Sequence, residues 1–134
     1  MKSSKFYADL ETKIIQTYEE GIAVEAAERL AAEFLRAQLV CSADLAKADL
    51  DARMRKTGVK AVRAAIYTAT CSGADKKPTE AAIEHSINSN DVVQQEQNGL
   101  DEAEVTRNEL ERYFSVFQNA HIYYRGIAKG NFNA

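Results

Sequence analysis

The feature that most constrains the fold is a long stripe of mainly apolar residues in the last third of the chain. Nine positions follow one another in alternating steps of three and four residues: Leu100, Ala103, Arg107, Leu110, Phe114, Phe117, His121, Tyr124 and Ala128. This spacing places one side chain per turn on a single helix face, and over so many turns it is typical of a helix packed in a seam. It predicts a long helix over residues 91–129.

A second stripe with the same spacing predicts another long helix, from about residue 22 to 56. Its members are Ala27, Leu30, Phe34, Ala37, Cys41, Leu45, Ala48 and Ala52. Short helices are expected at 3–20 and 79–88, with a loop at 71–78 that holds the only proline. Ser3 or Ser4, Thr79, and Asn90 or Ser89 are suited to cap the helices, because their side chains accept hydrogen bonds from free backbone N–H groups.

Gly58 leaves two alternatives open for the segment after residue 56. One glycine in a helix interior costs about 1 kcal/mol relative to alanine, which packing can offset. The long helix then continues to about residue 70. Alternatively, Thr57 and Gly58 form a hinge, and a new helix begins at Val59.

These elements predict an all-α fold in which two long antiparallel helices and shorter flanking helices form a helical bundle. At 134 residues the chain is expected to be a single domain. Two such seams are more apolar than one thin helix pair buries, so we expect a homo-oligomer with the last seam buried between or within protomers. The residues expected to support oligomerisation are Leu100, Leu110, Phe114, Phe117, His121 and Tyr124.

The net charge of −3 conceals a strongly uneven distribution. Residues 53–77 hold seven basic side chains and one acidic one, a net charge of +6. Residues 78–112 hold two basic and nine acidic side chains, a net charge of −7. This balance argues against a histone-like coat on DNA but is compatible with a localised binding surface.

A row of cations in the basic segment favours a polyanionic partner. On one helix, Arg53, Lys56, Lys60 and Arg63 fall within an arc of about 80°, and Tyr67 extends the row. We call these five residues the basic strip. Single-stranded nucleic acid suits it best, because phosphates meet the charges and a base stacks on the ring. Lys76 and Lys77 extend the surface. The alternative is a solvated polar face that binds no partner.

No pattern in the chain predicts catalysis, a metal site or a cofactor. His85 and His121 have no clustered acid or nucleophile, and Cys41 and Cys71 form no metal spacing. The carboxylates of residues 101–111 read as a solvated acidic run. We expect neither a secretory signal nor a membrane span, and therefore a cytoplasmic protein whose thiols stay reduced.

The layout resembles one known family. A helix with Lys60-Ala-Val-Arg63 and Tyr67 leads into a Ser72-Gly73 loop, followed by a short helix and a long one ending in Tyr124-Arg125-Gly126-Ile127-Ala128. This order resembles the UvsY family of phage recombination mediators. The resemblance, over residues 56–129, implies a small helical protein that binds single-stranded DNA, forms rings, and helps a recombinase displace single-strand-binding protein. It places Lys60 and Arg63 in the DNA-binding segment and residues 91–129 in the oligomerisation region, although residues 78–112 are more acidic than expected.

The sequence therefore predicts a non-enzymatic accessory protein that binds single-stranded nucleic acid, located in the bacterial host cytoplasm if a phage encodes it. A recombinase or a single-strand-binding protein is the expected protein partner. The alternative is a helical scaffolding or assembly protein that self-associates through its long helices. In that case the basic strip meets the acidic segment of a neighbouring protomer. The two differ in salt response, because binding to nucleic acid weakens steeply with salt.

Overall fold

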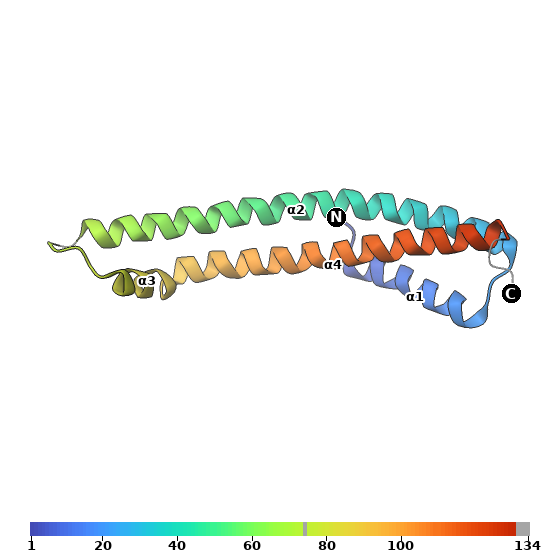
Figure 1. Cartoon of the computed structure of the whole chain (residues 1–134), viewed down its shortest axis with the longest axis horizontal. Coiled ribbons are helices and arrows are strands. Elements are labelled where there is room, and N and C mark those ends of the chain that lie inside the picture. Colours follow the sequence, from blue (N-terminus) through green and yellow to red (C-terminus); the bar gives the residue numbers. More distant parts are fainter. Residues whose placement is uncertain (74, 131–134) are drawn as a thin grey trace. The chain divides into compact units, whose positions relative to one another are not determined.

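The computed structural model describes residues 1–73 and 75–130, and every regular element in these ranges is a helix (Figure 1). The helices are α1 (Ser4–Glu20), α2 (Val24–Ser72), α3 (Glu80–Asn88) and α4 (Asp91–Ala128). The predicted all-α class is confirmed. None of the described helices is both long enough and apolar enough to cross a membrane.

Side chains named from the sequence cap three of the four helices. The Ser3 hydroxyl accepts from the backbone N–H of Phe6 at 3.3 Å, and the Thr79 hydroxyl accepts from that of Ala82 at 3.1 Å. Asn90 begins α4 because its side-chain oxygen accepts from the N–H groups of both Val92 and Val93. Each cap satisfies donors that have no partner inside the helix.

Helix α2 runs through Gly58 without a break over its 49 residues. Of the two alternatives for this segment, the structure has the continuous helix. A side chain at position 58 would meet only the Glu96 carboxylate, at an ordinary contact distance of 3.5 Å. No close backbone approach therefore requires a glycine at this position.

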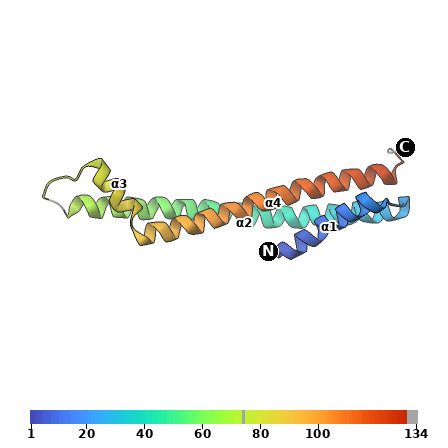
Figure 2. The ribbon, with the colours of Figure 1, turned by 90° about the horizontal axis from the view of Figure 1, so that it is seen from below.

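The chain forms two compact units, and α2 and α4 each contribute to both. The first unit consists of Met1–Lys47 with Asn108–Ala134, and the second of Ala48–Arg107. The first unit has an aromatic core in which Phe34 of α2 stacks on Tyr124 of α4, with ring centroids 5.5 Å apart. Tyr7 of α1 stacks on Tyr113 and Phe117 of α4. Figure 2 shows α1 beside the other two helices of this unit.

The buried face of α4 in the first unit is wider than the predicted stripe. Leu110, Phe117 and Tyr124 are buried as expected, whereas Phe114 and His121 are only half-buried. Tyr113 and Ala120, one position earlier, are buried instead. The reason is that α4 contacts two helices in this unit, so its apolar face must cover both.

The carboxylate side chain of Asp44 lies in the interior of the first unit with 4% of its surface exposed. Its carboxylate accepts a hydrogen bond from the Tyr7 hydroxyl at 2.5 Å and from the Lys2 backbone N–H at 2.8 Å. These bonds hold the beginning of the chain against α2. A buried carboxylate is tolerated only when such donors replace its lost hydration.

The core of the second unit is smaller and aliphatic. Ile83 and Ile87 of α3 and Val93 of α4 are buried together, and Val62, Ile66 and Cys71 of α2 pack against them. This cluster holds α3 on the part of α2 that carries the basic strip.

Candidate nucleic-acid interface

The basic strip lies on α2 within the second unit. Because α2 is continuous, the strip residues keep the alignment expected for one helix. Arg53, Lys56 and Lys60 are exposed, and Tyr67 leaves 39% of its surface open to solvent, whereas Arg63 is half-buried. Val59 and Ala52 lie on the adjoining arc and are buried. The helix therefore turns its apolar arc to the core and most of the strip to solvent.

Arg53 forms an ion pair inside α2. Its guanidinium lies 2.9 Å from the Asp49 carboxylate, and 76% of the Arg53 side chain is exposed. Ion pairs this exposed contribute about 0–1 kcal/mol, so a phosphate can compete with Asp49 for the guanidinium. Asp49 also lies 4.0 Å from Arg107 of α4.

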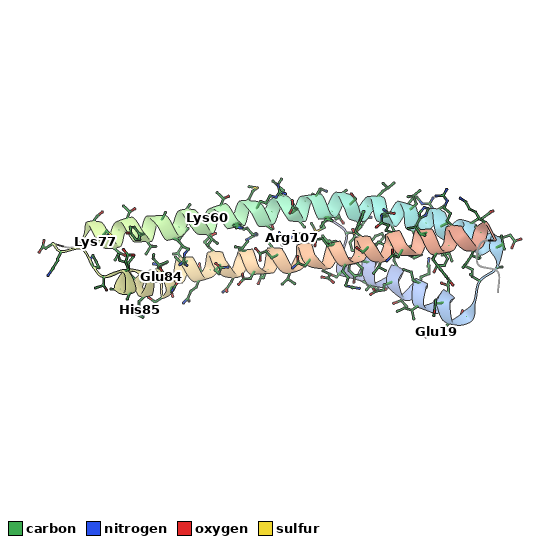
Figure 3. All side chains as sticks on the ribbon, in the orientation of Figure 1. Glu19, Lys60, Lys77, Glu84, His85 and Arg107 are labelled. Carbon is green, nitrogen blue, oxygen red and sulfur yellow. The ribbon has the colours of Figure 1, made fainter. Side chains whose placement is uncertain are left out.

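Arg63 is the one member of the strip that is held firmly within the chain. One of its terminal nitrogens, Nη2, donates to the Glu84 carboxylate at 3.0 Å, and both terminal nitrogens donate to the Asn88 side-chain oxygen at 3.3 Å. Only 35% of the Arg63 side chain is exposed. Glu84 lies on the side of α3 that faces α2, as Figure 3 shows. The sequence placed Arg63 among the phosphate contacts, but these bonds leave less of its charge available.

Lys56 and Lys60 are exposed, and neither ammonium has a carboxylate within 4.0 Å among the described residues. Figure 3 shows Lys60 on α2. In the loop after α2, Lys77 lies 3.7 Å from Glu80, whereas Lys76 is exposed and has no such pair in the described part of the chain. The positive charge most available to a ligand is therefore that of Lys56 and Lys60, with Arg53 beside them.

The acidic segment partly neutralises the basic one within a single chain. The Arg63–Glu84 and Lys77–Glu80 pairs each join residues 53–77 to residues 78–112. Residues 48–107 hold eight basic and ten acidic side chains, and 8 − 10 gives this unit a net charge of −2. Any attraction of a polyanion must therefore come from the local strip, over distances within a Debye length of about 10 Å.

The residues expected to support oligomerisation are largely covered inside one chain. Leu100, Leu110, Phe117 and Tyr124 are buried, and Phe114 is half-buried. The imidazole of His121 is half-buried, and its Nδ1 donates to the Ala31 carbonyl oxygen at 2.8 Å, so this nitrogen carries the hydrogen. These side chains are therefore covered mainly by their own chain, and they offer little surface to a second one.

The histidines and cysteines named from the sequence lie outside the basic strip. His85 is exposed on α3, and Figure 3 shows it directed away from α2. Within residues 1–73 and 75–130, no group of three or more histidine, cysteine or acidic side chains is placed to hold a metal ion. Cys41 is buried, and its thiol donates to the Leu110 carbonyl at 3.3 Å.

Sequence reasoning missed a polar hollow of about 230 Å³ beside the strip. It is lined by Arg63, Asn88, Val93, Gln94, Gln97 and Asn98. The available signal was the density of carboxamide side chains in residues 88–98, which hold three asparagines and three glutamines within a few helical turns. Their convergence with Arg63 depends on how α3 packs on α2, which no local pattern in the chain specifies.

Comparison of the chain with protein-family models, with curated proteins and with solved structures found no match in any of the three. The resemblance to the UvsY family therefore stays a prediction from the order of residues and elements.

Proposed function

We propose that this protein binds single-stranded nucleic acid through the basic strip and acts as a non-enzymatic accessory protein. The observation that carries the proposal is the unbroken course of α2, which keeps Arg53, Lys56, Lys60 and Tyr67 on one exposed helix face. The row from Arg53 to Tyr67 spans about 21 Å along the helix axis. Phosphates that replace counterions at the lysines, together with a base stacked on Tyr67, would supply the affinity.

The proposal includes an antiparallel pairing of α2 with α4. In the first unit, Phe34 of α2 contacts Tyr124 of α4. Cys41, later in α2, donates a hydrogen bond to the carbonyl of Leu110, which is earlier in α4. In the second unit, Asp49 lies near Arg107, whereas Gly58 lies near Glu96. In both units a later position on α2 meets an earlier position on α4, as an antiparallel pair requires.

We further propose that the protein acts as a homo-oligomer. A strip with two unpaired lysines is weak in one chain, and repetition around an assembly raises its avidity by effective concentration. With the resemblance to the UvsY family, this suggests a recombination mediator in the cytoplasm, acting with a recombinase or a single-strand-binding protein.

Fluorescence anisotropy with a labelled single-stranded oligonucleotide at low and high salt tests the binding. The informative variant is Lys56→Ala/Lys60→Ala, because these lysines make no ion pair in the described chain that their removal would break. The matched control is Lys5→Ala/Lys129→Ala, which removes the same charge at exposed positions off the strip.

We expect salt-sensitive binding by the wild type and the control variant. The strip variant should bind at least tenfold more weakly and show a salt slope reduced by about 1–2. If wild type fails to bind at low salt, or both double variants weaken equally, the strip is not a nucleic-acid site.

A scaffolding or assembly role is the second candidate, favoured by one observation in the second unit. Leu50 and Met54 of α2 are 59% and 65% exposed, which leaves apolar surface for a second copy. The Arg63–Glu84 pair lies within one chain, so it engages charge that this candidate would otherwise offer to a neighbouring protomer. This candidate predicts an assembly that persists in high salt and binds no oligonucleotide.

A further inference from the structure

We infer that the polar hollow beside the strip receives one nucleobase of the bound single strand. This inference rests on the proposed function and adds a second base site to a strip that already offers the Tyr67 ring for stacking. The hollow belongs wholly to the second unit, where α2 contributes Arg63, α3 contributes Asn88, and α4 contributes the remaining side chains.

Arg63 connects the hollow to the strip. It is a strip residue and also lines the hollow, and Lys60 precedes it by three residues, about 4.5 Å along the helix axis. A strand whose phosphates lie on Lys56 and Lys60 therefore passes close to the hollow. A base rotated away from the strand at that point would reach it without leaving the backbone contacts.

The walls of the hollow match the chemistry of a base. Carboxamides carry both donors and acceptors, as base edges do, and they form paired hydrogen bonds with bases. Within the described chain, the side-chain oxygens of Gln94 and Gln97 accept no hydrogen bond and the Asn98 side chain makes none. The amide nitrogens of Gln94 and Gln97 donate to the Asn88 carbonyl and the Asp101 carboxylate, which leaves their oxygens available to a ligand.

The guanidinium of Arg63 is fixed before any ligand arrives. Its bonds to Glu84 and Asn88 hold it in one orientation. An ordered, planar guanidinium is a stacking surface for an unpaired base, and little side-chain entropy remains to be lost on binding. Val93, buried in the unit's core, supplies an apolar part of the wall.

Charge and size favour a base over a phosphate or a carboxylate. The only cation among the lining residues is Arg63, and Glu84 already lies 3.0 Å from it. An added anion would meet a neutralised pair, whereas a neutral hydrogen-bonding group meets free amide atoms. The volume of about 230 Å³ is below the range of about 300–1,000 Å³ typical of sites for drug-sized ligands, which suits a single planar ring system.

The test compares two labelled oligonucleotides of equal length and charge, one with bases and one with abasic sites throughout, by anisotropy at one salt concentration. The variant Gln97→Ala/Asn98→Ala removes free amide atoms from the hollow. The control Gln95→Ala removes an exposed carboxamide from the same helix that does not line the hollow. Circular dichroism of each variant checks that the helices remain.

We expect wild type and Gln95→Ala to bind the strand with bases more tightly than the abasic strand. In the double variant, the ratio of the two affinities should fall by about five- to tenfold. Its affinity for the abasic strand should be unchanged, since the phosphate contacts remain. If the double variant keeps the full preference while wild type binds both strands, the base site is wrong but strip binding stands. If wild type binds neither strand, the proposed function fails as well.

Discussion

At the scale of single residues, the surroundings of the buried Asp44 carboxylate change its pKa. Burial raises the free energy of its charged form, but the hydrogen bonds from Tyr7 and Lys2 and the positive charges of the N-terminus and Lys47 outweigh this. The pKa of Asp44 therefore lies below its usual value, while burial and the bond to Asp44 raise the pKa of Tyr7. Both shifts keep an ionised acceptor beside a neutral donor.

This arrangement predicts a loss of stability in acid. A depressed pKa in the folded state means that Asp44 contributes its full stabilisation above the unfolded-state pKa of about 3.9 and loses it as the pH falls through the folded-state value. Urea denaturation at pH 7 and pH 3 should show a drop in unfolding free energy that is smaller in Asp44→Asn.

Removing the hydrogen-bond donor to Asp44 by Tyr7→Phe should lower the unfolding free energy by about 1–3 kcal/mol at pH 7. Tyr18→Phe, at an exposed position, is the control; an equal loss there would refute the special role of the buried pair.

The two cysteines should differ sharply in reactivity. Burial and the nearby Asp44 charge raise the pKa of Cys41 to about 11, and this thiol has no exposed surface. Only the thiolate reacts with alkylating reagents, so Cys41 should resist them in the native protein, whereas the half-exposed Cys71 should react. Mass spectrometry after labelling at pH 8 should find one modified thiol in the native protein and two in urea. Early labelling of Cys41 would mean that the first unit opens readily.

At the scale of elements, Gly58 decides whether α2 is rigid where the strip lies. The structure leaves room for a side chain there, so Gly58→Ala should raise the unfolding free energy by about 0.5–1 kcal/mol through helix propensity alone. Gly21 is the matched contrast, because its φ of 77° lies in the left-handed region and an alanine there should destabilise. Chemical denaturation measures both. Destabilisation by Gly58→Ala would indicate that α2 bends at this position.

Local sequence signals predicted where the helices begin, but they did not predict which face of each helix is buried. Ser3, Thr79 and Asn90 begin helices because each offers a side-chain acceptor next to free N–H groups, which is a property of a few adjacent residues. The seam of α4, by contrast, was predicted to include Phe114 and His121, and the buried positions are Tyr113 and Ala120. The sequence period locates an apolar face, but the neighbouring helices determine which side of it is covered.

At the scale of the whole molecule, the burial of the seam residues means that an oligomer interface has to be formed by other residues. Leu110 and Phe117 are covered inside one chain, so a homo-oligomer must use other residues, and the exposed Leu50 and Met54 of the second unit are available. We predict that Leu50→Ser/Met54→Ser lowers the mass measured by light scattering while the helical circular dichroism signal persists. Leu110→Ala should instead cost about 2–5 kcal/mol of stability, because it opens a cavity in the core. An unchanged mass for the serine variant would exclude this face from the assembly.

The sequence by itself determined the helical class and the approximate limits of the helices, whereas the alignment of the whole basic strip also needed the continuous course of α2 through Gly58. These depend on periodicity, capping and propensity, which act over a few residues and are readable in order along the chain. Only the tertiary structure decided that Arg63 is bound to Glu84 and Asn88, that Asp44 is buried beneath Tyr7, and that carboxamides of α3 and α4 gather beside the strip. The Arg63 and Asp44 contacts join residues 21 or more positions apart, and the geometry of all three depends on how helices pack rather than on any pattern within one of them.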